Sequence, residues 1–243
     1  MAKIEQVTSS INALTEEFNA ITHNLANVST AGYKRICNSF VKSLEAQLAG
    51  QDEELSGTIS IDKQLDFSQG SLVETGRSLD FAIYGKGFFV IETPEGPLYT
   101  RNGIFYTNQN GQITDCDGRI VAGQSGPVTL PLGTALSQIN VSADGSISAK
   151  GTVIGKFNIV DFKENENNLV AVGGNCFKMP DENITPVPAD KIIVRQGYQE
   201  SSNVKTVDEL VDMIMVSRLY EANMKFLAAQ RETSSSIISV AMG

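Results

Sequence analysis

Apolar residues near the amino terminus recur alternately three and four positions apart. The series is Ile4, Val7, Ile11, Leu14, Phe18, Ile21, Leu25 and Val28. This spacing predicts an amphipathic helix with a narrow apolar seam, as in coiled coils. The helix is expected to end in residues 29–32, where Gly32 supplies the left-handed conformation that stops helices. An apolar seam of this kind needs a partner that covers it.

A second long helix is predicted at the other end of the chain. Thr206 to Glu209 fits a capping box, and neither Gly nor Pro follows before about Val240. At about 100° per residue, the apolar positions of this helix fall on two opposite faces. One face holds Met213, Val216, Tyr220, Met224 and Leu227, and the other holds Met215, Leu219, Ala222, Phe226 and Ala229. We expect the amino-terminal helix to cover one face and a neighbouring subunit to cover the other.

The middle of the chain has the pattern of a β domain. Short β-rich runs occur at 81–84, 87–91 and 191–194, and Asn-Gly or Asp-Gly turns occur at 110–111, 117–118 and 144–145. Such dipeptides are typical of tight hairpin turns. Further structural turns are predicted at Gly85, Gly87 and Gly197, in addition to Gly32.

These patterns predict an α+β fold in which paired long helices, coiled-coil-like, enclose an inserted all-β domain. The predicted domains are a helical assembly domain of residues 1–36 plus 197–243, an extended arm or linker of 37–78, and an all-β outer domain of 79–196. Within the arm, Phe40 to Leu48 could prolong a helix, whereas Thr58 to Gly76 is expected to be extended.

Charge and composition exclude several classes of function. The 243 residues include 19 Lys and Arg against 28 Asp and Glu, which gives a net charge of −9. An acidic chain repels polyphosphates, so we expect no nucleic-acid partner. No apolar run reaches the length of a membrane-spanning helix, so no membrane insertion is expected. The amino-terminal residues also lack the pattern of a secretory signal peptide.

The residue types that carry most enzyme chemistry are scarce. The chain has one histidine, His23, which lies off the apolar seam, and three widely spaced cysteines, Cys37, Cys116 and Cys176. They form no CxxC pair, so neither a zinc site nor a disulfide framework is indicated. Asp115 to Gly118 resembles the start of a calcium loop, but the required Glu is absent and a hairpin turn is favoured. We therefore predict no catalytic residue, metal, cofactor or small-molecule substrate.

Three blocks of sequence resemble the bacterial flagellar rod and hook family. Residues 23–35, HNLANVSTAGYKR, are similar to its N-L-A-N-x-x-T-x-G-[FY]-K signature. Residues 79–89, LDFAIYGKGFF, followed by YTRNG at 99–103, are similar to its second signature. Residues 196–204, QGYQESSNV, and the later RLYEAN at 218–223 are similar to its third.

The resemblance implies a structural subunit of the flagellar basal-body rod, a tube that spans the periplasm, transmits torque and passes exported subunits. Its partners would be copies of itself, other rod or hook subunits and the flagellar type III export apparatus, with the terminal helices lining the tube and the β domain outside. Residues 123–131 favour a proximal-rod protein, whereas 196–204 and 220–223 also fit a distal-rod protein. A β-rich binding or adhesin-like module is an alternative that explains the middle of the chain alone.

The predicted assembly interface combines apolar residues of both helices with polar residues of the signatures. Its members are Ile11, Leu14, Phe18, Ile21, Asn24, Leu25, Asn27, Met215, Leu219, Tyr220, Ala222, Asn223 and Phe226. At the predicted helix stop, Gly32→Val is expected to block assembly while the β domain stays folded.

Overall fold

The chain forms two compact units in a computed structural model that describes residues 2–42, 59–131, 133–190 and 192–242. The terminal unit comprises Met1–Ala26, Ile36–Gln64 and Lys205–Gly243. The β unit comprises Asn27–Arg35 and Leu65–Val204. The backbone therefore passes between the two units four times.

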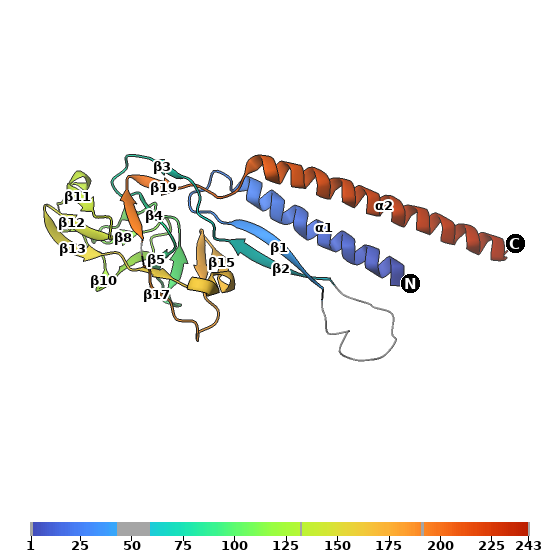
Figure 1. The fold of residues 1–243 in the computed structure, drawn as a ribbon, viewed down its shortest axis with the longest axis horizontal. Helices are drawn as coiled ribbons and strands as arrows, with labels where there is room; N and C mark the ends of the chain where they lie inside the picture. Colours follow the sequence, from blue (N-terminus) through green and yellow to red (C-terminus); the bar gives the residue numbers. More distant parts are fainter. Residues whose placement is uncertain (1, 43–58, 132, 191, 243) are drawn as a thin grey trace. The chain divides into compact units, whose positions relative to one another are not determined.

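The terminal unit contains one long helix from each end of the chain and most of a two-stranded sheet. The helices are α1 (Ala2–Ala26) and α2 (Thr206–Met242), and the strands are β1 (Arg35–Lys42) and β2 (Ile59–Asp66). Figure 1 shows α2 running alongside α1 and continuing beyond the amino-terminal end of α1. Both predicted helices are confirmed. The predicted capping box would place Thr206 just before the helix, but Thr206 is the first helical residue of α2.

The predicted enclosure of the β domain by paired long helices is wrong. The chain is α+β, with a single helix at each end and a mostly β region between them. The hydrophobic clusters of the β unit are made from residues of that unit alone, so no helix is needed to complete them. The helices also differ in length, at 25 and 37 residues, or about 37 and 55 Å. Thus α1 is too short to pair along the whole of α2.

The predicted helical extension in the arm is also wrong where the structure describes it. Phe40 lies in strand β1, and residues 43–48 lie outside the described residues. Extended structure at the end of the arm is confirmed by β2 and by β3 (Leu72–Glu74).

The β unit is built from short strands that pair antiparallel. The main sheet has the order β15-β16-β6-β5-β9-β8-β7, with β10 on β9 and with β14 between β5 and β17. Its strands are β5 (Phe88–Glu92), β6 (Leu98–Thr100), β7 (Tyr106–Thr107), β8 (Ile113–Thr114), β9 (Ile120–Gly123), β10 (Gly126–Pro127), β14 (Ile159–Asp161), β15 (Val170–Gly173), β16 (Cys176–Lys178) and β17 (Val187–Pro188).

Three smaller sheets complete the β unit. The first consists of β11 (Ile139–Val141), β12 (Ser146–Ala149) and β13 (Thr152–Lys156). The second pairs β4 (Phe81–Tyr84) with β18 (Ile193–Gln196), and the third pairs β3 with β19 (Tyr198–Glu200). In the described residues, the connections include the 3-10 helices Leu136–Gln138 and Lys163–Asn168.

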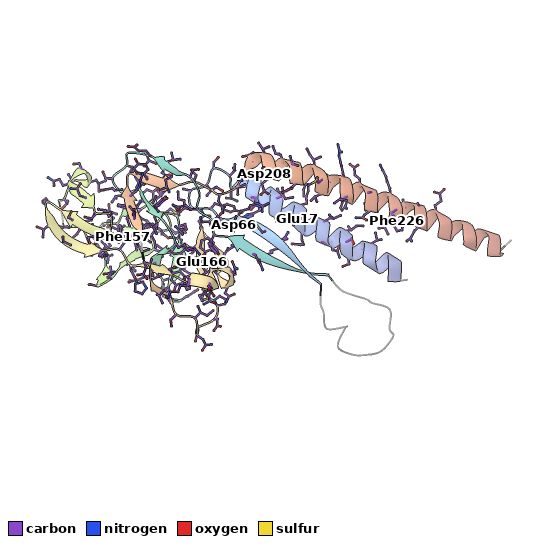
Figure 2. The ribbon with its side chains drawn as sticks, viewed as in Figure 1. Glu17, Asp66, Phe157, Glu166, Asp208 and Phe226 are labelled. Atoms are coloured by element: carbon purple, nitrogen blue, oxygen red, sulfur yellow. The ribbon has the colours of Figure 1, made fainter. Side chains whose placement is uncertain are left out.

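Phenylalanine rings form the centre of the β unit. Phe157, labelled in Figure 2, packs edge-on against Phe81 and Phe89, with ring centroids 5.0 and 5.5 Å apart. Such edge-to-face pairs add to the free energy gained by burying the rings. A second cluster on the other side of β5 includes Phe88 and Phe177. The alternation of Phe88 and Phe89 between two clusters follows from the period of two in a strand.

The three predicted Asn-Gly and Asp-Gly turns are confirmed. Gly111, Gly118 and Gly145 have positive φ values of 76°, 81° and 84°, and each lies in the connection between neighbouring antiparallel strands.

The Asp144 carboxylate stabilises the turn between β11 and β12. It accepts hydrogen bonds from Ser146 Oγ at 2.7 Å and Lys156 Nζ at 3.1 Å, and together with the Ser146 amide these lower the pKa of Asp144 from 3.8 to about 2. Because the pKa is lower in the folded state, this stabilising contribution is present above pH 3.8 and is lost as the pH falls towards 2.

Ser146→Ala is therefore expected to raise the pKa of Asp144 towards 3.8, because the hydroxyl is the largest cause of the shift. An NMR titration of the Asp144 carboxyl carbon measures this. Ser148→Ala, on the same strand, serves as the control, because the Ser148 hydroxyl donates to Asn140 O instead. An unchanged midpoint in Ser146→Ala would contradict the assignment.

Candidate assembly surface

Asn24 connects three elements of the terminal unit. Its side chain lies on α1 and is buried, with 1% exposed. Asn24 Nδ2 donates to Ile36 O at 2.9 Å and to Glu209 Oε2 at 3.2 Å, while its Oδ1 accepts from Ile36 N at 2.9 Å. The Asn24 amide thus bonds to both backbone groups of Ile36 in β1, as a neighbouring strand would, and it also donates to the buried Glu209 carboxylate of α2. An asparagine suits this position because it both donates and accepts.

The small sheet is joined to α1 by further polar contacts. Asn38 Nδ2 donates to Glu17 Oε2 at 2.8 Å, and Lys63 Nζ lies 3.0 Å from Glu16 Oε2. Figure 2 labels Glu17 on α1. The lysine pair is largely exposed, so it adds little to stability. The contacts show that α1 packs against β1 and β2 as well as against α2.

One apolar face of α2 points towards α1. An open cavity of about 340 Å³ lies between the helices and is lined by Leu14, Thr15, Phe18, Val216, Ser217, Tyr220 and Glu221. Val216 is buried, and Met213 and Leu227 on the same face are half-buried. Tyr220 and Met224, also on this face, are 39% and 45% exposed, so α1 covers the face only in part.

The other face of α2 carries large apolar side chains that remain exposed in the described part of the chain. They are between 46% and 72% exposed and comprise Val207, Leu210, Val211, Ile214, Met215, Leu219 and Phe226. At about 100° per residue they span half of the helix circumference. We call these residues the outer face of α2. A monomer rarely exposes a contiguous apolar surface of this kind, which is typical of an interface.

The structure distributes the predicted interface residues over several environments. Ile21 and Asn24 are buried, whereas Ile11, Leu14, Leu25, Asn27 and Asn223 are half-buried. The exposed members are Phe18, Met215, Leu219, Tyr220, Ala222 and Phe226. Only Met215, Leu219, Ala222 and Phe226 lie together on the outer side of α2, while Asn27 belongs to the β unit. The four predicted turn glycines, Gly32, Gly85, Gly87 and Gly197, have φ values of +69°, +106°, +143° and +77°.

Sequence reasoning missed the buried charged residues. Glu209 on α2 is fully buried, as are Lys34 and Glu200 in the β unit. Lys34 and Glu200 stand within two of the three signature blocks, which is the signal that could have identified them. Their residue types alone predict exposure, because Lys and Glu are seldom buried unless they are paired.

The side chains that the sequence analysis considered for catalysis or metal binding are Asp115, the cysteines and His23. The Asp115 carboxylate accepts hydrogen bonds from Asp117 N, Arg119 N and Arg119 Nε, so it closes the predicted hairpin turn. Burial raises the pKa of the Cys176 thiol to about 11, and the thiol is therefore protonated at neutral pH. His23 is exposed on α1. Among the described residues, no three His, Cys, Asp or Glu side chains are grouped to hold a metal ion.

Within the described part of the chain, neither long helix has an apolar stretch able to cross a membrane.

Comparisons with known proteins converge on one family. Residues 82–149 match the family described as flagellar hook protein FlgE/F/G D1 domain, and residues 195–240 match the flagellar basal body rod FlgEFG protein C-terminal family. The flagellar basal-body rod protein FlgG of Buchnera aphidicola subsp. Acyrthosiphon pisum is 31% identical, over 90% of this chain and 91% of the relative.

Two other relatives match over similar lengths. The flagellar basal-body rod protein FlgF of Mesorhizobium japonicum is 32% identical, over 92% of this chain and 90% of the relative. FlgG of Agrobacterium fabrum is 30% identical, over 97% of both chains.

Proposed function

Because the chain belongs to the bacterial flagellar basal-body rod family, we propose that its copies assemble with one another, and with other rod or hook subunits, through their terminal helices. The chain is a structural subunit of the flagellar basal body rather than an enzyme.

The observation that carries the proposal is the outer face of α2. Covering apolar surface contributes about 25 cal/mol per Å² removed from water. Among the described residues, seven large apolar side chains on this face remain between 46% and 72% exposed. Contact with α1 occupies the opposite face, so the two faces suit a helix held between its own chain and a neighbour.

The proposal extends to the form of the assembly. A tubular rod with the terminal helices lining the inner tube and the β units outside would place the outer faces of α2 against neighbouring copies. We also propose that the chain reaches this site through the flagellar type III export apparatus. The relatives include both FlgG and FlgF at similar identity, so the proposal covers the rod as a whole rather than its proximal or distal part.

Phe226→Asp tests the proposal. The ring is 48% exposed on α2 (Figure 2), so the folded monomer tolerates a carboxylate there, whereas an apolar interface does not. We expect the concentration needed for polymerisation to rise at least about 30-fold, which corresponds to about 2 kcal/mol at a central interface residue. Analytical ultracentrifugation over rising concentration measures this, and circular dichroism confirms that the helices are retained.

Val153→Asp provides the matched control, because Val153 is an exposed apolar residue of the β unit, at 68%. This variant should polymerise like the unmodified chain. Polymerisation of Phe226→Asp at the unmodified concentration would contradict assembly through the outer face of α2.

A further inference from the structure

Three charged side chains meet inside the β unit. The side chains of Lys34, Glu200 and Arg101 are 0%, 0% and 3% exposed. Lys34 Nζ lies 2.7 Å from Glu200 Oε1, and Arg101 Nη1 lies 3.6 Å from Glu200 Oε2. Each residue comes from a different signature block, so three blocks that are far apart in the sequence meet at one buried point.

Backbone groups also bond to these charges, although Glu200 Oε2 and Arg101 Nε have no hydrogen-bond partner among the described residues. Lys34 Nζ also donates to Ser68 O at 2.7 Å, and Glu200 Oε1 accepts from Gly70 N at 3.0 Å. Arg101 Nη1 donates to Gly85 O at 2.8 Å. Burial lowers the pKa of the Lys34 ammonium group, and the Glu200 carboxylate opposes that shift. The charged state of the lysine therefore depends on the segment that carries Glu200.

Asn203 joins the same segments a short distance away. Its Oδ1 accepts from Arg35 N at 2.7 Å, and its Nδ2 donates to Asp66 O at 2.7 Å. In addition, Gly32 N donates to Glu200 O at 2.7 Å. Three chain segments, 32–35, 66–70 and 200–203, are thus bonded to one another by both backbone and side-chain groups.

The position of these segments in the chain is informative. The backbone first enters the β unit at Asn27 and leaves it after Arg35. It returns at Leu65 and leaves again after Val204. Each bonded segment therefore lies within a few residues of a passage between the units. A local opening of any one segment would remove at least one hydrogen-bond partner from the buried Lys34 or Glu200, which is far more costly than separating an exposed pair.

We propose that Lys34, Glu200 and Asn203 form a clasp that makes the segments 32–35, 66–70 and 200–203 open and close as one cooperative element. The clasp is a conformational device of the β unit, and it does not depend on how copies of the chain assemble. It joins the chain segments next to three of the four points where the backbone enters or leaves this unit.

Hydrogen exchange of individual backbone amides, measured by NMR on the full chain, tests the clasp. The reporters are the amides of Gly32, Arg35, Gly70 and Ser201, of which the last donates to Ser71 O at 2.8 Å. In Asn203→Ala, only the Arg35 amide loses its direct acceptor. A clasp predicts that the Gly32, Gly70 and Ser201 amides also exchange at least 10-fold faster, by a common factor. Acceleration of the Arg35 amide alone would overturn the proposal.

Glu200→Gln gives a second reading, because it keeps the shape of the side chain and removes the charge that faces Lys34. All four amides are expected to lose protection together, whereas the Phe105 amide, which donates to Leu79 O in the core, keeps its protection. Loss of protection at Gly70 alone would overturn the proposal. Glu74→Gln on β3 is the matched control, since Glu74 is exposed. If Glu200→Gln does not fold, the Asn203→Ala result decides.

Discussion

Gly32→Ala is expected to destabilise the β unit by about 2 to 5 kcal/mol. The left-handed backbone at φ +69° costs an L-residue about 1 to 2 kcal/mol. A Cβ at this position would also lie 2.5 Å from Asn102 N and 2.6 Å from Asn102 Cα. These are backbone atoms that cannot rotate away, and forced overpacking adds about 1 to 3 kcal/mol.

Gly76→Ala separates the two effects. Gly76 has a similar φ of +71° and also lies in the β unit, but a Cβ there would meet nothing within 4 Å. This variant should therefore lose only the stability that the left-handed backbone costs an L-residue, about 1 to 2 kcal/mol. Urea unfolding of both variants, followed by circular dichroism, measures the difference. Equal losses in Gly32→Ala and Gly76→Ala would show that the close approach to Asn102 is unimportant.

The structure thus changes the expected outcome of substitution at Gly32. From the sequence, Gly32→Val would affect the turn and assembly but leave the β domain folded. Because Gly32 packs against the backbone of Asn102 and donates to Glu200 O, the effect is now expected to reach the β unit itself.

Asn24→Ala is expected to destabilise the terminal unit by about 3 to 5 kcal/mol. The substitution leaves the backbone N–H and C=O of Ile36 without the Asn24 amide and removes a donor from the buried Glu209 carboxylate. Each buried group that loses its partner costs about 1 to 3 kcal/mol. Thermal unfolding followed by helical circular dichroism, together with hydrogen exchange of the Ile36 amide, measures the loss.

Asn19→Ala is the matched control for Asn24→Ala. Asn19 lies on the same helix and is exposed, so its replacement should change stability by no more than about 0.5 kcal/mol. Similar unfolding temperatures for Asn24→Ala and the unmodified chain would mean that the junction between α1, β1 and α2 does not depend on this amide.

The regular elements were predictable because their signals are local. The spacing of apolar residues gives α1 and α2, and Asn-Gly or Asp-Gly turns give the hairpins around Gly111, Gly118 and Gly145. The strand at residues 81–84 follows from its apolar and aromatic composition. Each of these features depends on interactions between near neighbours in the chain.

The arrangement of the helices was not predictable because an apolar seam does not specify its partner. The seam of α1 indicates that something must cover it, and α2 alone was expected to do so. The structure adds β1 and β2 as partners of α1, through Asn38 and Lys63. The strand β1 itself escaped prediction, since RICNSFVK lacks a clear alternation of apolar and polar residues.

The candidate site was predictable only where it is apolar. The two-faced pattern of α2 indicates the exposed Met215, Leu219 and Phe226, but the predicted face did not include the other four residues of the outer face, which are Val207, Leu210, Val211 and Ile214. The polar contacts of Asn24 with Glu209, and of Lys34 with Glu200, join residues 185 and 166 positions apart. No local pattern encodes a pairing at such distances.

The pairing of β3 with β19 has a consequence for how such chains can vary. Thr75 N donates to Gly197 O at 2.7 Å, so the chain departs on a long excursion and comes back at the same spot. The residues between Thr75 and Gly197 therefore form an insertion whose two ends adjoin, as the ends of an inserted domain do. This insertion also contacts the chain outside it, since Asn175 Nδ2 donates to Ala31 O at 3.0 Å and Arg101 Nη1 lies 3.6 Å from Glu200 Oε2, so any replacement of it has to preserve these contacts.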